Sequence, residues 1–169
     1  GVARAGVKKL VLFNAHGGHV GAMDIVAREL REAHDLLVYS VSWFNLPLDG
    51  IELSRFAVHA GEAERTMMLA LAPELVRMEA AQDFASTSAQ RAADYPLIGN
   101  GRSAKMGWAM QDYNAQGAAG NAAAATAQQG QAIVDAAARQ LASLIGEVST
   151  LPLSTLVSGP SFTEPSDRS

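Results

Sequence analysis

The fold of this protein is decided by residues 7–19, which read VKKLVLFNAHGGH. The apolar run 10–13 carries no charge and is typical of a strand buried on both faces, as in a parallel sheet. A glycine-rich turn, 14–19, follows it. Apolar residues then recur at helical spacing over 21–33, and 36–42 (LLVYSVS) is typical of a second strand. The order strand, turn, helix, strand is a βαβ unit, whose right-handed crossover makes the two strands parallel.

We therefore expect an α/β fold with three layers, α/β/α, and a mainly parallel sheet. Two further helices are predicted over 62–71 and 126–145, because each has apolar residues along one face. Residues 76–93 are polar and alanine-rich, and no element is assigned to them. The tail, 158–169, is rich in Ser, Pro and charge, so we expect it to be disordered. A single domain is predicted over 1–157.

The composition is that of an ordinary globular protein, with 49% hydrophobic and 18% charged residues among 169. The net charge of −4 gives no basic field, so neither nucleic acid nor a membrane is an expected partner. The absence of cysteine excludes disulfides, thiolate metal sites and cysteine nucleophiles. A cytoplasmic location is the default expectation. The chain begins with Gly1 rather than Met, which fits a processed chain or a piece of a longer one.

His16 is the first candidate for chemistry, because it follows the first strand and precedes a helix. Ligands of open α/β sheets bind outside the carboxyl ends of the strands, and a neutral imidazole is a good ligand for zinc, iron or manganese. The adjacent Gly17 and Gly18 let the backbone approach a ligand closely. For a lone histidine, a structural role in capping the turn is the commoner alternative. His19 is a candidate second ligand, although its position favours the edge of the site or solvent.

A second candidate cluster lies at the start of the helix predicted over 62–71. His59 precedes Glu62 by three residues and Glu64 by five. A histidine and a carboxylate together suit general acid–base or metal chemistry. Glutamates are also enriched in the first turn of a helix because of its dipole, which is the structural alternative.

Aromatic residues offer candidate walls for a substrate pocket. Trp43 follows the second predicted strand, and Trp108 lies in the long middle segment. Such rings suit a planar or amide substrate, while ordinary core packing is the alternative. The sequence has no nucleophile elbow, phosphate-binding loop or dinucleotide fingerprint.

Three segments together resemble the creatininase (creatinine amidohydrolase) family. The turn 14–19, NAHGGH, is similar to the family's N-[GA]-H-G-G-N. Residues 59–69, HAGEAERTMML, resemble its H-A-G-x-x-E-T-S-x-M-L. Residues 117–130, GAAGNAAAATAQQG, resemble its G-x-x-G-D-P-x-x-A-T-A-x-x-G. Their order and spacing match over about 7–145, which makes the resemblance specific for the family but not for a substrate.

The resemblance implies a metal-dependent hydrolase of non-peptide amide C–N bonds, of the cyclic amide or formamide type. Zinc, manganese or iron would activate water. His16 and Glu64 would be metal ligands, and His59 the catalytic histidine. Glu62 occupies a more variable position and, with the tryptophans, is assigned to substrate binding. The family also implies a small-molecule amide as partner and a homo-oligomer.

Several positions depart from the family pattern. His19 replaces Asn, Arg65 replaces Thr, and Asn121 with Ala122 replaces Asp-Pro. Creatininases proper carry a glutamate ligand at the position of Gly18, so creatinine is a less favoured substrate. The family's first motif, E-x-H-G-x-H-L-P-x-x-x-D, does not occur in the sequence.

We therefore expect a domain that is incomplete at its N-terminus, with the other ligands on a longer chain or on a partner. Two protein ligands alone would bind a divalent metal weakly, since catalytic sites normally use three. The alternative is a non-catalytic small-molecule-binding protein or a structural subunit with the same fold.

Overall fold

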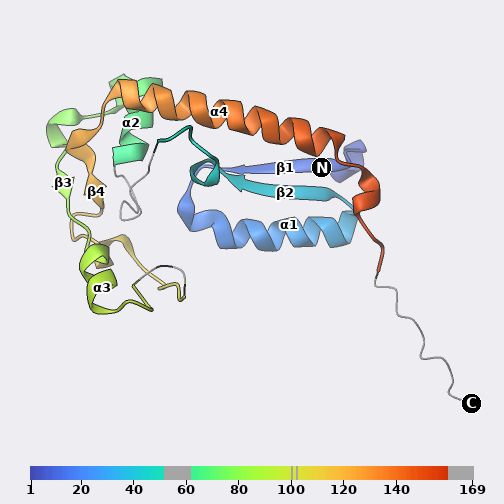
Figure 1. The fold of residues 1–169 in the computed structure, drawn as a ribbon, viewed down its shortest axis with the longest axis horizontal. Helices are drawn as coiled ribbons and strands as arrows, with labels where there is room; N and C mark the ends of the chain where they lie inside the picture. The colour runs from blue at the N-terminus through green and yellow to red at the C-terminus, as the bar shows by residue number, and fades with distance from the viewer. Residues whose placement is uncertain (52–61, 100, 102, 160–169) are drawn as a thin grey trace, which may run out of the picture. The chain divides into compact units, whose positions relative to one another are not determined.

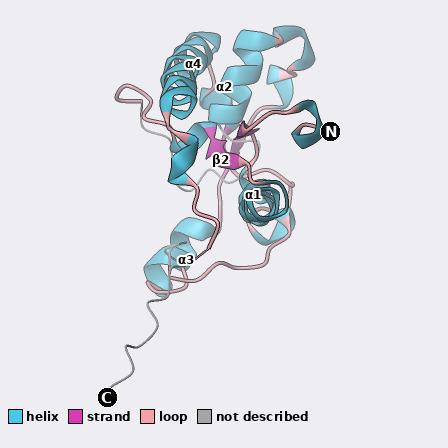
Figure 2. Ribbon diagram, turned by 90° about the vertical axis from the view of Figure 1, so that its right-hand side faces the viewer, coloured by secondary structure: helices cyan, strands magenta, loops and turns pink. Residues whose placement is uncertain are grey.

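The computed structural model describes residues 1–51, 62–99, 101 and 103–159. The chain forms two compact units, one of Gly1–Asn45 with Leu141–Ser169 and the other of Leu46–Gln140. Helix predominates over strand (Figure 2). The helices are α1 (Val20–His34), α2 (Glu62–Leu71), α3 (Ser88–Asp94) and α4 (Ala127–Thr150), and the strands are β1 (Lys9–Asn14), β2 (Leu37–Ser42), β3 (Asp83–Phe84) and β4 (Gly120–Asn121).

The predicted βαβ unit lies in the N-terminal part of the first compact unit. Strands β1 and β2 are parallel, in a register that pairs Lys9 with Leu37 and Asn14 with Ser42. Helix α1 connects them and lies alongside the strands (Figure 1). The α/β class and the parallel pairing are thus confirmed, whereas the three-layer arrangement stays a prediction.

The burial of the two strands differs from the expectation for β1. On and before β2, Leu36, Leu37 and Val41 are buried, but in β1 the side chain of Phe13 is 51% exposed. Strand β1 pairs only with β2 among the described residues, and α1 packs mainly against β2. An uncharged apolar run therefore predicts the strand here but not its burial on both faces.

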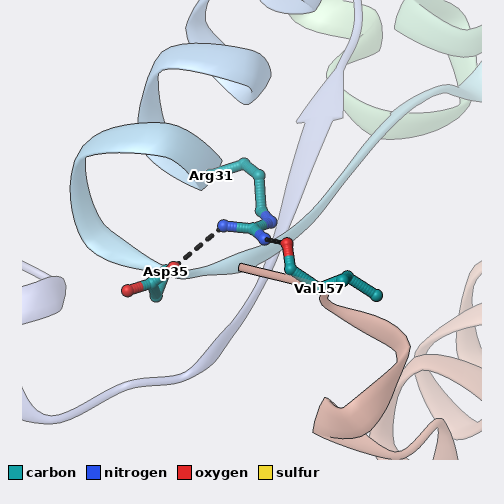
Figure 3. Close-up of polar contacts among 3 residues, drawn as sticks. All are labelled: Arg31, Asp35 and Val157. Carbon is teal, nitrogen blue, oxygen red and sulfur yellow. Dashed lines mark hydrogen bonds and ion pairs between the residues drawn. The ribbon is translucent and has the colours of Figure 1, made fainter. Parts of the chain in front are cut away.

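The chain segment after α4 is held to α1 by Arg31. Figure 3 shows the guanidinium of Arg31 between the carboxylate of Asp35 and the carbonyl oxygen of Val157, and it donates a 2.9 Å hydrogen bond to each. On the strand side, the Lys9 ammonium donates to the carbonyl oxygen of Ser149 at 2.5 Å. These contacts join the C-terminal part of the first unit to its βαβ core.

A close helix crossing organises the second compact unit. Gly130, in the first turns of α4, is buried against the backbone of Thr66 in α2, and Thr66 is itself only 1% exposed. A Cβ at position 130 would lie 1.9 Å from the carbonyl oxygen of Thr66 and 3.0 Å from the nitrogen of Met67. Only glycine permits this approach between the two backbones.

The N-terminus of α4 is capped by Thr126. Its hydroxyl accepts a hydrogen bond from the Gln129 backbone N–H at 3.2 Å and donates one to the Gln129 side-chain oxygen at 2.6 Å. The cap satisfies one N–H group that has no partner within the helix. The helix continues to Thr150, five residues beyond the predicted end at Ile145. No helix in the described part of the chain is long and apolar enough to cross a membrane.

Short elements occupy the stretch 76–93, for which no element was assigned. Strand β3 pairs antiparallel with β4, where Phe84 lies opposite Gly120. Phe84 packs with Ala118 and Ala122 in a small buried cluster. The prediction of a disordered tail falls mostly on 160–169, outside the described residues, and the single domain over 1–157 stays a prediction.

We expect Gly130→Ala to destabilise the protein by about 1–3 kcal/mol, because the added methyl group overlaps the Thr66 carbonyl oxygen. Urea unfolding monitored by circular dichroism measures the free energy of unfolding of each variant. Gly146→Ala is the matched control in the same helix, since a Cβ there meets no atom within 4 Å. It should raise stability by about 0.5–1 kcal/mol through helix propensity. Equal effects of the two changes would contradict the close crossing.

A second prediction concerns Asp49, whose φ of 51° begins a left-handed turn with Gly50. The hydrogen bond from Arg139, 2.7 Å long, and its charge hold the pKa of Asp49 below its ordinary value of 3.8. The pair therefore stabilises the fold above pH 3.8, and this contribution is lost as the pH falls through the lowered pKa. Arg139→Ala should return the carboxyl titration, followed by NMR, toward 3.8, whereas Arg91→Ala should leave it unchanged.

Candidate functional site at the glycine-rich turn

The turn that carries His16 is anchored by the buried side chain of Asn14, which is 3% exposed. The Asn14 amide nitrogen donates to the Ser42 hydroxyl at 3.0 Å, and its oxygen accepts from the His16 backbone N–H at 3.0 Å. One side chain thereby joins the carboxyl ends of β1 and β2 and sets the direction of the turn.

The two histidines of the turn lie side by side. His16 has an extended backbone and precedes the 3-10 helix Gly17–His19, and the His19 N–H donates to the His16 carbonyl oxygen at 3.1 Å. The ring centroids are 4.9 Å apart, with the ring planes at 76°. His16 is half-buried, while His19 is exposed, as expected from its position.

Gly18 accommodates the imidazole of His16. A Cβ at position 18 would lie 2.9 Å from Nε2 of His16 and 3.2 Å from its Cδ2. The ring therefore occupies the space that any side chain at position 18 would need. The glycine has a normal φ here, so its role is steric and does not depend on an unusual backbone conformation.

Trp43 begins the 3-10 helix Trp43–Asn45 directly after β2 and is only 7% exposed. Its ring packs edge-to-face against Phe44, with centroids 5.8 Å apart. A Cβ added at Gly17 would lie 4.0 Å from the ring of Phe44. Trp43 and His16 thus follow the two neighbouring strand ends in one compact unit, and the role of Trp43 in substrate binding stays a prediction.

Glu62 and Glu64 both belong to α2, in the second compact unit. Glu64 is half-buried and lines a cavity of about 390 Å³. The other lining residues come from α2 and from the segment that follows it: Arg65, Met68, Leu75, Val76, Arg77 and Ala80. A carboxylate and two guanidinium groups at a partly apolar cavity suit a small polar ligand. His59 lies outside the described residues.

Trp108 also belongs to the second unit and is 39% exposed. Its ring contacts that of Tyr113 edge-to-face, with the centroids 5.3 Å apart. The guanidinium of Arg91 lies over the Tyr113 ring, 5.3 Å from its centroid. The exposed part of the indole is available to a ligand, and this role too stays a prediction.

The predicted ligands His16 and Glu64 come from different compact units, so the complete metal site also stays a prediction. Within the described ranges, no group of three or more His, Asp or Glu side chains has a metal-binding arrangement. The sequence pattern did not single out Asn14 or Arg77. Asn14 belongs to the recognised turn, but its hydrogen bond to Ser42 depends on the pairing of the two strands. Arg77 lines the same cavity as Glu64 only because of tertiary packing.

We expect Gly18→Ala to displace the His16 imidazole, because the new methyl group would overlap Nε2. The ring-proton resonances of His16 and His19 should both shift in NMR spectra, since their rings are in contact. Gly21→Ala is the control, with no atom within 4 Å of the added Cβ. Unchanged histidine resonances in Gly18→Ala would contradict this arrangement.

Comparison with known proteins gives a consistent result. The model of the Creatininase family, described as creatinine amidohydrolase, matches residues 1–145. A candidate creatinine amidohydrolase from Bacteroides fragilis is 26% identical with a TM-score of 0.67, over 90% of this chain and 58% of that one. A creatinine amidohydrolase (creatininase) is 25% identical with a TM-score of 0.62, over 89% and 60%. A comparison with curated protein sequences gives no match.

A further structure, described as creatininase Mn, is 24% identical with a TM-score of 0.60, covering 86% of this chain and 58% of that one, and shows likeness of fold alone. The chain thus spans 58–60% of the length of these structures. The family model covers most of the chain, and the turn 14–19 follows the carboxyl end of β1, where Asn14 bonds to Ser42 of β2. The chain belongs to the creatininase (creatinine amidohydrolase) family.

Proposed function

We propose that this chain carries part of the active site of a metal-dependent hydrolase that cleaves a non-peptide amide C–N bond. The observation that carries the proposal is the position of His16 at the joined carboxyl ends of β1 and β2, within a chain of this family. Similar structures are described as creatininase Mn, as a mutant creatininase of Zn-Zn type and as a mutant creatininase complexed with creatine. These descriptions support a divalent metal and a small-molecule substrate here.

The donor types of the predicted ligands fit such a metal. An imidazole and a carboxylate are ordinary ligands of zinc, manganese and iron. His16 is half-buried, and Glu64 lines a cavity. We propose that both hold the metal together with at least one further protein ligand, because catalytic zinc sites use about three.

The reaction places specific demands on the side chains. A bound divalent metal would supply polarisation of the amide carbonyl and of a water molecule. Hydrolysis forms a C–O bond, breaks the C–N bond and moves a proton from water to the leaving nitrogen. We assign His59 to deliver a proton to the nitrogen, and a carboxylate would accept the proton that water loses.

Substrate contacts are assigned to Glu62, Trp43 and Trp108. The cyclic amide and formamide types remain the proposed substrate classes. Arg65 and Arg77, which line the same cavity as Glu64, favour a substrate with a negatively charged or strongly polar group. A homo-oligomer in the cytoplasm is also proposed, on the basis of the family resemblance and the composition.

The test is hydrolysis by the 169-residue chain loaded with zinc or manganese, followed as substrate loss by NMR. The panel would contain creatinine, a simple cyclic amide and a formamide. Activity should disappear when a chelator is added. His16→Ala and Glu64→Gln should each lower kcat/KM by about 100-fold or more, because mutation of a residue that only hydrogen-bonds to a metal ligand already lowers activity by about 10–100-fold.

His34→Ala is the matched control, because His34 is the exposed last residue of α1 and should leave activity unchanged. Absence of hydrolysis with both metals and every substrate would reject the catalytic proposal for this chain. Binding of an amide without turnover would instead support the non-catalytic alternative.

A further inference from the structure

His19 has no role in the proposed reaction, yet its ring is held next to that of His16. Both backbones belong to one tight turn, closed by the hydrogen bond from the His19 N–H to the His16 carbonyl oxygen. The turn is tied to the sheet by Asn14, and the His16 ring is packed over Gly18. The two imidazoles are therefore presented together by a backbone that has few alternatives.

The separation of the rings agrees with binding of one metal ion. Zinc lies about 2.0–2.1 Å from an imidazole nitrogen, which puts the ring centre about 3.2 Å from the metal. Two such rings are about 4.5 Å apart for a right angle at the metal and about 5.2 Å apart for a tetrahedral angle. The observed separation of the centroids, 4.9 Å, lies between these two values.

We propose that His16 and His19 form a two-histidine site for a transition metal, with His19 as a protein ligand beside His16. The inference rests on the proposed function for the role of His16 and extends it to a residue that departs from the family motif. The exposed side of His19 leaves room for water or for further ligands. A pair of imidazoles suits zinc, nickel or copper better than magnesium or calcium.

An edge-to-face contact between the rings is the competing explanation, because aromatic pairs prefer centroid distances of about 4.5–7 Å. The two explanations differ in what they require of position 19. Metal binding needs the imidazole nitrogen, whereas an aromatic contact needs only the flat ring. Loss of the imidazole nitrogen at position 19 should therefore weaken metal binding if the proposal holds.

The experiment titrates Zn²⁺ into the 169-residue chain and follows the ring protons of its four histidines by NMR, with calorimetry for the affinity. The resonances of His16 and His19 should shift together and saturate at one ion per chain, while those of His34 stay in place. His19→Asn should weaken Zn²⁺ binding by about 10-fold or more, since loss of even an indirect partner costs about 10–100-fold. The matched control, His34→Asn, should bind as the wild type does.

The outcomes separate this inference from the proposed function. If His16→Ala weakens Zn²⁺ binding but His19→Asn does not, the pair is rejected and His16 remains a candidate ligand. If Zn²⁺ leaves the His16 and His19 resonances of the wild type unchanged, the pair is rejected without the use of any variant. If Zn²⁺ binds the pair but no amide is hydrolysed, the pair stands and the proposed catalytic function fails. Circular dichroism of each variant checks that the fold is retained.

Discussion

The buried side chain of Asn14 is the constraint on which the first compact unit and its candidate site depend. Its amide nitrogen donates to Ser42 and its amide oxygen accepts from the His16 backbone N–H. These two bonds fix where β1 ends relative to β2 and how the chain leaves the sheet. A buried amide that lost either partner would leave a polar group unsatisfied, at a cost of about 1–3 kcal/mol. The relative position of the two strand ends and the presentation of His16 thus depend on the same side chain.

Most of the long elements could be predicted from sequence because their signals are local. The helix over 62–71 agrees with α2 residue for residue, and the strand–turn–helix–strand order agrees with β1, α1 and β2. The short elements could not, because two-residue strands such as β3 and β4 exist only through their mutual pairing. The exposure of Phe13 was likewise unpredictable, since an apolar run does not say which neighbours cover it.

The candidate site was predictable as a set of residue types but not as a geometry. The motif drew attention to His16, and its surroundings bear out a position at the strand ends. The neighbours that give the site its chemical character depend on the folded structure: Arg77 lines the same cavity as Glu64, and the ring of His19 contacts that of His16. Spacing in the chain indicates which side chains are close in sequence, but the tight turn decides which atoms meet.

The steric role of Gly18 has a consequence for how this turn evolves. Any new side chain at position 18 begins 2.9 Å from Nε2 of His16, so such a mutation requires the imidazole to move. The His16 ring also contacts the exposed ring of His19. The residues at positions 16, 18 and 19 are therefore linked by epistasis, because a new functional group at one of them changes the space that the His16 imidazole can occupy.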